Sequence, residues 1–176
     1  SNVSSQVSDI CSATGFLYRE FGRVDTLIGM SLGGAAALLA SQLIPGLKSV
    51  VTIASPSDTH HLGGALLGMN RDIGIEGEGQ VTIGNRQFLI RRQLLDDLNQ
   101  QDVGVAVESL GIPLLILHSI QDKTLGYHHA QRLADSAGER GYLVSLQTAD
   151  HLLTDPADVQ RVTQEITGWL QGLGTE

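Results

Sequence analysis

The most constraining feature of this sequence is a serine between two glycines, placed where a strand-like pattern changes into a helical one. Gly29, Ser31 and Gly33 form the pattern G-x-S-x-G. Residues 24–28 before it are mostly apolar, and residues 34–40 after it are rich in alanine and leucine. This context is typical of a nucleophile elbow, in which small flanking residues leave room for a strained turn. We expect the serine hydroxyl to project above a sheet edge, beside the free N–H groups of the helix start.

The composition narrows the class of protein. A chain of 176 residues with 41% hydrophobic residues is long enough for one domain with a real core. The 19 acidic against 11 basic residues give a net charge of -8, which argues against binding to nucleic acid or anionic membranes. Cys11 is the only cysteine, which excludes an internal disulfide and a multi-cysteine metal site. Without a long apolar run or a signal-peptide pattern, we expect a cytoplasmic protein.

Short apolar runs alternate with helical patterns, which predicts an α/β fold with about four parallel core strands flanked by helices. We assign residues 1–176 to one such domain. The expected core strands are residues 24–28, 48–53, 114–118 and 142–147. The expected helices are residues 3–21, 32–43, 62–67, 91–100, 127–137 and 157–170.

Residues 55–110 interrupt this alternation and are expected to form a cap-like insertion. Two strand patterns, residues 73–83 and 86–90, flank Gly84 and Asn85, a dipeptide that suits a tight hairpin turn. A helix is expected after this hairpin. An excursion between core strands is a place where a cap over a pocket is built.

Two residues far along the chain are predicted to activate the serine. A serine hydroxyl becomes a good nucleophile when a base removes its proton and an acid orients that base. Asp122 follows the third predicted core strand, and His151 follows the fourth. Because the carboxyl ends of parallel strands meet at one sheet edge, both loops are expected beside Ser31. We therefore predict Ser31 as the nucleophile, Asp122 as the acid and His151 as the base.

Other interpretations of these acidic and basic residues stay open. Asp122 is also placed to cap a following helix. Asp58, in the loop after the second predicted core strand, is a rival acid, although a structural role in its turn is favoured. His151 is also explained as a loop histidine beside Asp150.

The remaining histidines are interpreted as structural. His118 ends an apolar strand and is expected to be hydrogen-bonded at the edge of the core. The side chains of the adjacent pairs His60 and His61, and His128 and His129, are expected to diverge at the surface or beside a pocket. No ligands at metal spacing accompany them, so we expect neither a metal site nor a cofactor.

Several segments together carry a family resemblance. They are residues 27–36, 75–79, 88–98, 117–122 and 149–153. They resemble the α/β-hydrolase superfamily, and within it the hydrolase part of bacterial proteins in which this domain is fused to an OsmC-like peroxide-reducing domain. The resemblance covers nearly the whole chain and implies the carboxyl-terminal part of an α/β-hydrolase fold. It also implies Ser31, Asp122 and His151 as the triad, with the Leu32 N–H as one oxyanion donor.

The sequence departs from this family at three places. Met30 stands where such proteins usually carry histidine, which changes the polarity beside the nucleophile but not the triad. No OsmC-like domain follows, so peroxidase activity is not carried over. The resemblance implies four strands and a helix before residues 3–21, and we expect this chain to lack them, and with them the loop that gives the second oxyanion N–H. Residues 24–28 would then be an unpaired edge, so we expect a homo-oligomer or association with a separate amino-terminal fragment.

The leading expectation is a serine hydrolase that acts on small carboxylic esters by acyl transfer. Its expected partner is a small-molecule ester, with no nucleic acid and no membrane. The alternative is a truncated, catalytically impaired relative that works as an oligomeric binding or interaction module.

Overall fold

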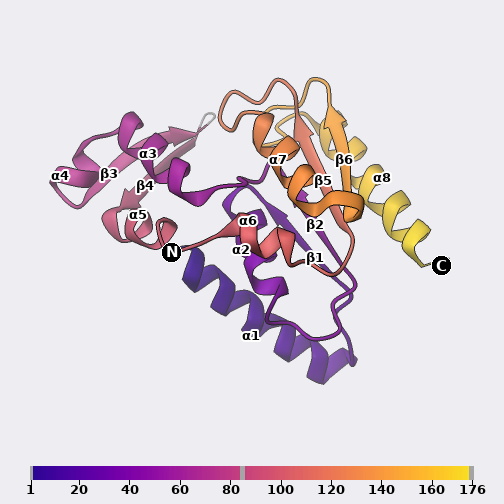
Figure 1. The fold of residues 1–176 in the computed structure, drawn as a ribbon. Coiled ribbons are helices and arrows are strands. Elements are labelled where there is room, and N and C mark those ends of the chain that lie inside the picture. Colours follow the sequence, from indigo (N-terminus) through magenta and orange to yellow (C-terminus); the bar gives the residue numbers. More distant parts are fainter. Residues whose placement is uncertain (1, 84–85, 175–176) are drawn as a thin grey trace.

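Four parallel strands form the central sheet, in the order β1-β2-β5-β6, and helices flank it (Figure 1). The computed structural model describes residues 2–83 and 86–174. The strands are β1 (Thr26–Met30), β2 (Ser49–Ile53), β3 (Glu78–Ile83), β4 (Arg86–Arg91), β5 (Leu114–Ser119) and β6 (Gly141–Leu146). The helices are α1 (Val3–Phe21), α2 (Leu32–Ser41), α3 (Thr59–Met69), α4 (Asp72–Ile75), α5 (Arg92–Leu98), α6 (Val103–Glu108), α7 (His128–Ala137), the 3-10 helix η1 (Gly138–Arg140) and α8 (Pro156–Leu173). The predicted α/β fold with parallel core strands flanked by helices is confirmed.

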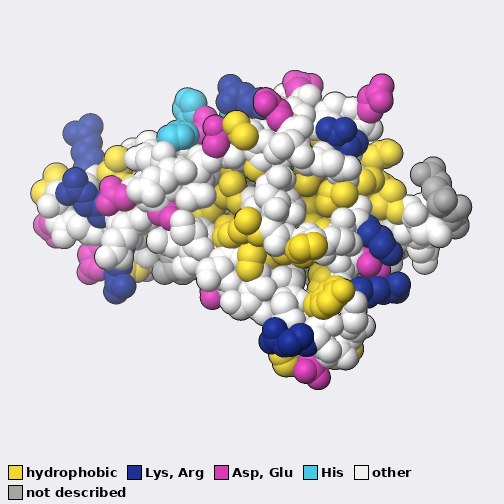
Figure 2. All heavy atoms as spheres, turned by 60° about the horizontal axis from the view of Figure 1, so that its bottom comes forward, with side chains coloured by type: hydrophobic (Ala, Val, Ile, Leu, Met, Phe, Trp, Pro, Cys, Tyr) yellow, Lys and Arg dark blue, Asp and Glu magenta, His cyan; other side chains and the backbone are white. Residues whose placement is uncertain are grey.

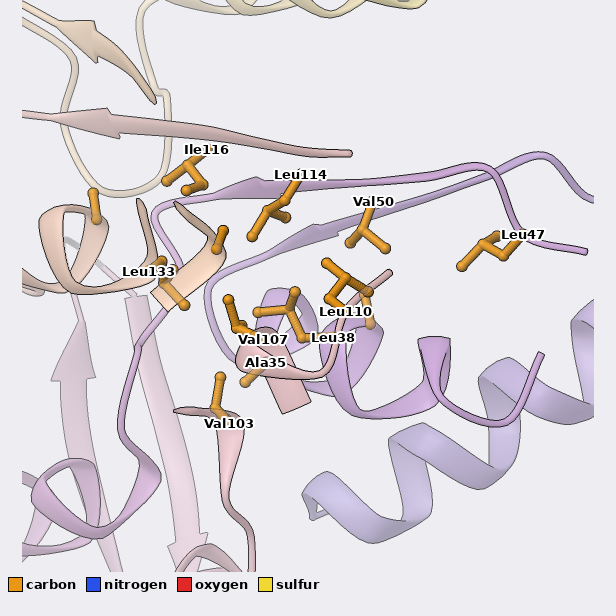
Figure 3. Packing of buried hydrophobic residues seen from close by; sticks show 13 residues of the cluster. Ala35, Leu38, Leu47, Val50, Val103, Val107, Leu110, Leu114, Ile116 and Leu133 are labelled. Carbon is orange, nitrogen blue, oxygen red and sulfur yellow. The ribbon is translucent and has the colours of Figure 1, made fainter. Parts of the chain in front are cut away.

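Helices cover both faces of this sheet because successive strand residues point to opposite sides. Val50 of β2 and Leu114 of β5 pack toward α2, α6 and α7, whereas the next residues, Val51 and Leu115, pack toward α8. Figure 3 shows the first cluster, with Leu38 of α2 lying across from Val50. This two-sided burial explains why every residue of β2 and β5 is buried and why β5 begins with four consecutive apolar residues. Among the described residues, no helix is both long and apolar enough to cross a membrane.

The parallel register brings three loops to one edge of the sheet. Met30 at the end of β1 is paired with Ile53 at the end of β2, which in turn is paired with Leu117 of β5. His118 of β5 is paired with Ser145 near the end of β6. The chain segments that leave β1, β5 and β6 therefore begin side by side.

A smaller unit built from α3, α4, β3, β4 and α5 lies beside the sheet (Figure 1). Strands β3 and β4 form the expected antiparallel hairpin, from the pair Glu78 and Arg91 to the pair Ile83 and Arg86. The predicted turn residues Gly84 and Asn85 lie outside the described residues. The apolar core of the unit includes Ile73, Val81 and Leu98, and it is completed by Val3 of α1 and Ala36 of α2. A role of this unit as a cap stays a prediction.

Two elements of this region differ from the expectation. The strand expected at residues 73–83 begins only at Glu78, because residues 72–75 form the short helix α4, which buries Ile73 completely. Gly77, with a φ of 89°, then turns the chain from helix to strand. Helix α6 was not expected, since its sequence VGVAVE is rich in β-branched residues. The Asp102 side chain supports it by accepting a hydrogen bond from the Val105 N–H.

A buried histidine ties the start of the smaller unit to α7. The Nδ1 atom of His129 accepts hydrogen bonds from the N–H of Ser57 at 3.2 Å and from its hydroxyl at 3.0 Å. The rings of His128 and His129 lie 4.3 Å apart, and His129 is buried, so the expectation that this pair diverges is wrong. Burial, assisted by the nearby His128 and His118, lowers the pKa of His129 to about 4.

This shift predicts a loss of stability in mild acid. The unfolded chain binds a proton at His129 near pH 6.5, whereas the folded chain does so near pH 4. Unfolding therefore takes up a proton between these values, and the free energy of unfolding should fall by about 3 kcal/mol as pH drops from 6.5 to 4. His118, whose pKa burial also lowers, adds to the same loss. Urea unfolding across this range measures it.

The matched variant is His129→Asn, which keeps an acceptor near the Nδ1 position but does not titrate. We expect a flatter dependence of unfolding free energy on pH in this variant, with a residual slope from His118. An unchanged slope would show that His129 does not titrate as described.

Candidate active site

Ser31 occupies a strained turn between β1 and α2. Its φ of 52° and ψ of -127° lie in a region that non-glycine residues rarely adopt, at a cost of roughly 1–3 kcal/mol. The Ser31 N–H donates a 2.8 Å hydrogen bond to the carbonyl of Ile53 at the end of β2. The sheet thus holds the strained residue in place, and its hydroxyl is presented at the edge where the strands end.

Close backbone packing around the turn requires two glycines. A Cβ atom on Gly29 would lie 2.3 Å from the Gly33 carbonyl oxygen, and one on Gly34 would lie 2.6 Å from the Ser55 side chain. By contrast, a Cβ on Gly33 would meet no heavy atom within 4 Å. The expectation that Gly33 is needed for room beside the serine is therefore wrong; the second glycine that close packing requires is Gly34, which lies against Ser55.

The structure brings Ser31, His151 and Asp122 into one chain of hydrogen bonds. The Ser31 Oγ lies 2.9 Å from the His151 Nε2, and the His151 Nδ1 lies 2.7 Å from the Asp122 Oδ2. His151 and Asp122 are buried, at 5% and 8% exposure, while Ser31 is partly exposed. The first side chain follows β1, the second follows β6 and the third follows β5, so the parallel register accounts for their meeting.

The charge on Asp122 determines the direction of these hydrogen bonds. Burial alone would raise the pKa of this carboxyl, but hydrogen bonds from His151 and from the N–H groups of Leu125 and Thr124 hold it below its usual value. An ionised carboxylate only accepts, so the His151 Nδ1 carries the hydrogen. The His151 Nε2 is then free to accept the Ser31 hydroxyl proton.

The loop that carries His151 is stabilised by the residue before it. Asp150 Oδ1 accepts hydrogen bonds from the N–H groups of Leu152 at 3.1 Å and Thr154 at 2.9 Å, and its other oxygen binds the Thr154 hydroxyl. The Thr154 contacts lower the pKa of the Asp150 carboxyl. Leu153, with a φ of 52°, completes this tight turn. Asp150 therefore has a local structural role that shapes the position of His151.

The remaining predicted site residues have separate places. Leu32 is the first residue of α2, so its N–H has no acceptor within the helix and lies next to Ser31. The rival acid Asp58 caps α3 by accepting from the N–H groups of His60 and His61, and it also binds the His61 ring. In the described segments, no group of three or more His, Cys, Asp or Glu side chains is arranged to hold a metal ion.

One residue at this site was not assigned a part in it from the sequence. His118 is hydrogen-bonded at the edge of the core, as expected, but its Nε2 also lies 3.5 Å from the Asp122 Oδ2. The spacing of four residues between His118 and Asp122 is the only signal in the sequence, and it does not reveal which way either side chain points.

The glycine contacts predict a sharp difference between two similar substitutions. In Gly29→Ala the new methyl group meets backbone atoms that cannot move without distorting the elbow, so we expect loss of the Ser31 geometry and a destabilisation of about 1–3 kcal/mol. In Gly33→Ala the methyl group enters open space in a helix, where alanine is favoured, so stability should be unchanged or higher. Thermal unfolding of the pair measures this, and equal effects would contradict it.

Comparison with known proteins places this geometry in a family. No protein-family model and no curated protein sequence matches the chain. Among solved structures, the esterase domain of a Rhodothermus marinus protein is 32% identical, with a TM-score of 0.78 over 96% of this chain and 68% of its own. Est1E from Butyrivibrio proteoclasticus is 16% identical, with a TM-score of 0.83 over 100% of this chain and 70% of its own. Alpha/beta hydrolase domain-containing protein 10 from mouse is 19% identical, with a TM-score of 0.74 over 98% and 71%. The chain therefore belongs to the α/β-hydrolase superfamily.

Proposed function

We propose that this protein is a serine esterase that hydrolyses small carboxylic esters through Ser31, His151 and Asp122. The observation that carries the proposal is the hydrogen-bond chain from the Asp122 carboxylate through His151 to the Ser31 hydroxyl. The name of the Rhodothermus marinus relative, an esterase domain, supports ester chemistry.

In the first half of the proposed reaction, the Ser31 Oγ attacks the carbonyl carbon of the ester. The hydroxyl proton passes to the His151 Nε2, which lies 2.9 Å away, and the resulting imidazolium is stabilised by Asp122. The Leu32 N–H and the positive end of α2 stabilise the oxyanion. Collapse of this intermediate breaks the ester C–O bond, and the leaving alkoxide takes the proton from His151.

In the second half, water hydrolyses the acyl group on Ser31. His151 accepts a proton from the attacking water, and a second oxyanion forms beside Leu32. Its collapse releases the carboxylic acid, and the proton on His151 returns to the Ser31 oxygen. The site is thereby restored without any cofactor.

The alternative function, a catalytically impaired binding module, is not favoured. Burying the His151 and Asp122 side chains costs desolvation energy, and the two are placed with the hydrogen-bond geometry that a nucleophilic serine needs. The esterase relative points in the same direction.

We also propose that another polypeptide segment adds a strand to the edge of β1. Within the described part of the chain β1 pairs with β2 alone, and Ile28 is 54% exposed. Phe16 and Phe21 of α1 are exposed as well, and Figure 2 shows hydrophobic side chains gathered in the middle of one face. Unpaired N–H and C=O groups on such an edge are a template for strand addition. For the chain purified alone, the available segment is a second copy.

The esterase proposal predicts selective labelling of one serine. A fluorophosphonate probe should label the folded wild-type protein at Ser31, and p-nitrophenyl acetate should be hydrolysed. Ser31→Ala should abolish labelling and lower kcat by about a thousandfold or more. Ser57→Ala is the matched control, because Ser57 is also hydrogen-bonded to a histidine, His129, yet has no place in the proposed reaction. Absence of labelling in folded wild-type protein would rule out the esterase proposal.

The edge proposal predicts self-association. Sedimentation equilibrium of the chain alone should give a mass above that of one copy, and Ile28→Lys should shift it toward a single copy, because charge on an edge strand opposes pairing. Ile75→Lys is the control, since Ile75 is 78% exposed on α4 rather than on β1. A wild-type protein that stays monomeric at all concentrations would contradict the proposal.

A further inference from the structure

A second histidine is completely enclosed beside the proposed catalytic acid. His118 lies in β5, is 1% exposed, and its Nε2 is 2.8 Å from the backbone carbonyl oxygen of Leu125. A carbonyl oxygen only accepts, so the Nε2 carries the hydrogen. The Nδ1 is buried and has no hydrogen-bond partner among the described residues. The ring is therefore the neutral tautomer with its one N–H at Nε2.

The His118 Nε2 also lies near the carboxylate of Asp122. The His118 Nε2 is 3.5 Å from the Asp122 Oδ2, the same oxygen that accepts the hydrogen bond from the His151 Nδ1 at 2.7 Å. The Leu125 backbone bridges the two side chains. Its N–H donates to the Asp122 Oδ1 at 2.9 Å, and its carbonyl accepts from the His118 Nε2. Asp122, Leu125 and His118 thus form a closed ring of polar contacts.

The surroundings keep His118 uncharged. A second proton would sit at the Nδ1, where no acceptor is present among the described residues. The charged or titratable groups that act on the ring are Asp122, His151 and His128. Burial lowers the pKa of His118 despite the Leu125 carbonyl and the Asp122 carboxylate, both of which would raise it. His118 therefore acts as an N–H donor and not as a second base.

The ring of His118 is itself held by Tyr127, the residue before α7. It meets the Tyr127 ring edge to face, with centroids 6.0 Å apart and planes at 87°. The Tyr127 hydroxyl is hydrogen-bonded to the Ser145 hydroxyl of β6 at 2.5 Å. The donor is therefore fixed relative to both strands that lead to the proposed acid and base.

We propose that His118 is a positioning residue for the reaction: its Nε2–H holds the Leu125 carbonyl, and the Leu125 N–H in turn holds the Asp122 carboxylate, so that the carboxylate stays aimed at His151. The catalytic part of this inference rests on the proposed esterase function. The geometric part is the effect of His118 on the hydrogen bond between Asp122 and His151, and it does not depend on that function.

The test compares two substitutions of equal length. In His118→Gln the amide nitrogen lies the same number of bonds from Cα as the Nε2, so the donor is kept, whereas His118→Met fills the space without a donor. Thermal unfolding first shows that both variants fold. If His118→Met does not fold, His118→Asn replaces it, because its amide is too short to reach the Leu125 carbonyl.

We compare the variants by proton NMR, which does not require enzymatic activity, and by ester hydrolysis. The hydrogen-bonded Nδ1–H proton of His151, identified by its loss in His151→Gln, is followed by proton NMR. We expect this resonance to be unchanged in His118→Gln and to move upfield or broaden in His118→Met. With p-nitrophenyl acetate, kcat should fall about tenfold or more in His118→Met with little change in KM, since a misplaced acid affects the transition state more than substrate binding. His118→Gln should keep most of the wild-type kcat.

The outcomes separate this inference from the proposed function. If His118→Met keeps the wild-type kcat and resonance, or if a folded His118→Gln loses as much as His118→Met, the positioning role is wrong and packing of the ring explains the residue. If wild-type protein is not labelled at Ser31, the esterase proposal fails, and the NMR comparison still tests whether His118 orients Asp122.

Discussion

The parallel pairing of β1, β2, β5 and β6 is the constraint on which the rest of the molecule depends. A hydrogen-bonded parallel ladder fixes both the spacing of strands and the edge at which each one ends. Ser31, Asp122 and His151 are separated by 91 and 29 residues, yet each lies in the first loop or turn after a strand of one sheet. Bringing these three residues together costs conformational entropy. The burial of the apolar strands offsets this cost, so the contacts within the site do not have to.

The strain at Ser31 is tolerable because neighbouring backbone enforces it. The Ser31 N–H is satisfied by the Ile53 carbonyl of β2, and Gly29 lets the backbone at Gly33 and Gly34 approach closely. Gly34 in turn lets α2 pack against Ser55, in the loop after β2. Pairing of β1 with β2 and packing of α2 against the loop after β2 thus both constrain the turn at Ser31. A serine hydroxyl in a relaxed turn would lose this fixed position relative to His151.

Much of this arrangement was predictable, and the parts that were not share a physical cause. Ser31 is signalled by adjacent residues, and the loops of Asp122 and His151 follow from the rule that parallel strands end at one edge. Gly34 was overlooked because its need for space arises from Ser55, 21 residues away in sequence. The sequence pattern predicts a strand at Ile73, but the structure has a helical turn there, because burial in a separate core and not local periodicity decides its conformation. The burial of His129 beside His128 likewise involves a long-range contact, because its hydrogen-bond partner Ser57 is 72 residues away in sequence.

The two carboxylate oxygens of Asp122 bind different partners. Oδ1 accepts the N–H groups of Thr124 and Leu125 and so belongs to the loop, whereas Oδ2 accepts from His151 and belongs to the site. In the proposed positioning role, the uncharged His118 opposes rotation of the carboxylate through its hydrogen bond to Leu125, without adding a full charge that would compete with the imidazolium of His151 in the proposed reaction. A lysine or arginine at this position would stabilise the carboxylate more strongly, but it would weaken the stabilisation of the positive charge that His151 carries in the proposed reaction. An uncharged donor therefore suits this place better than a cation.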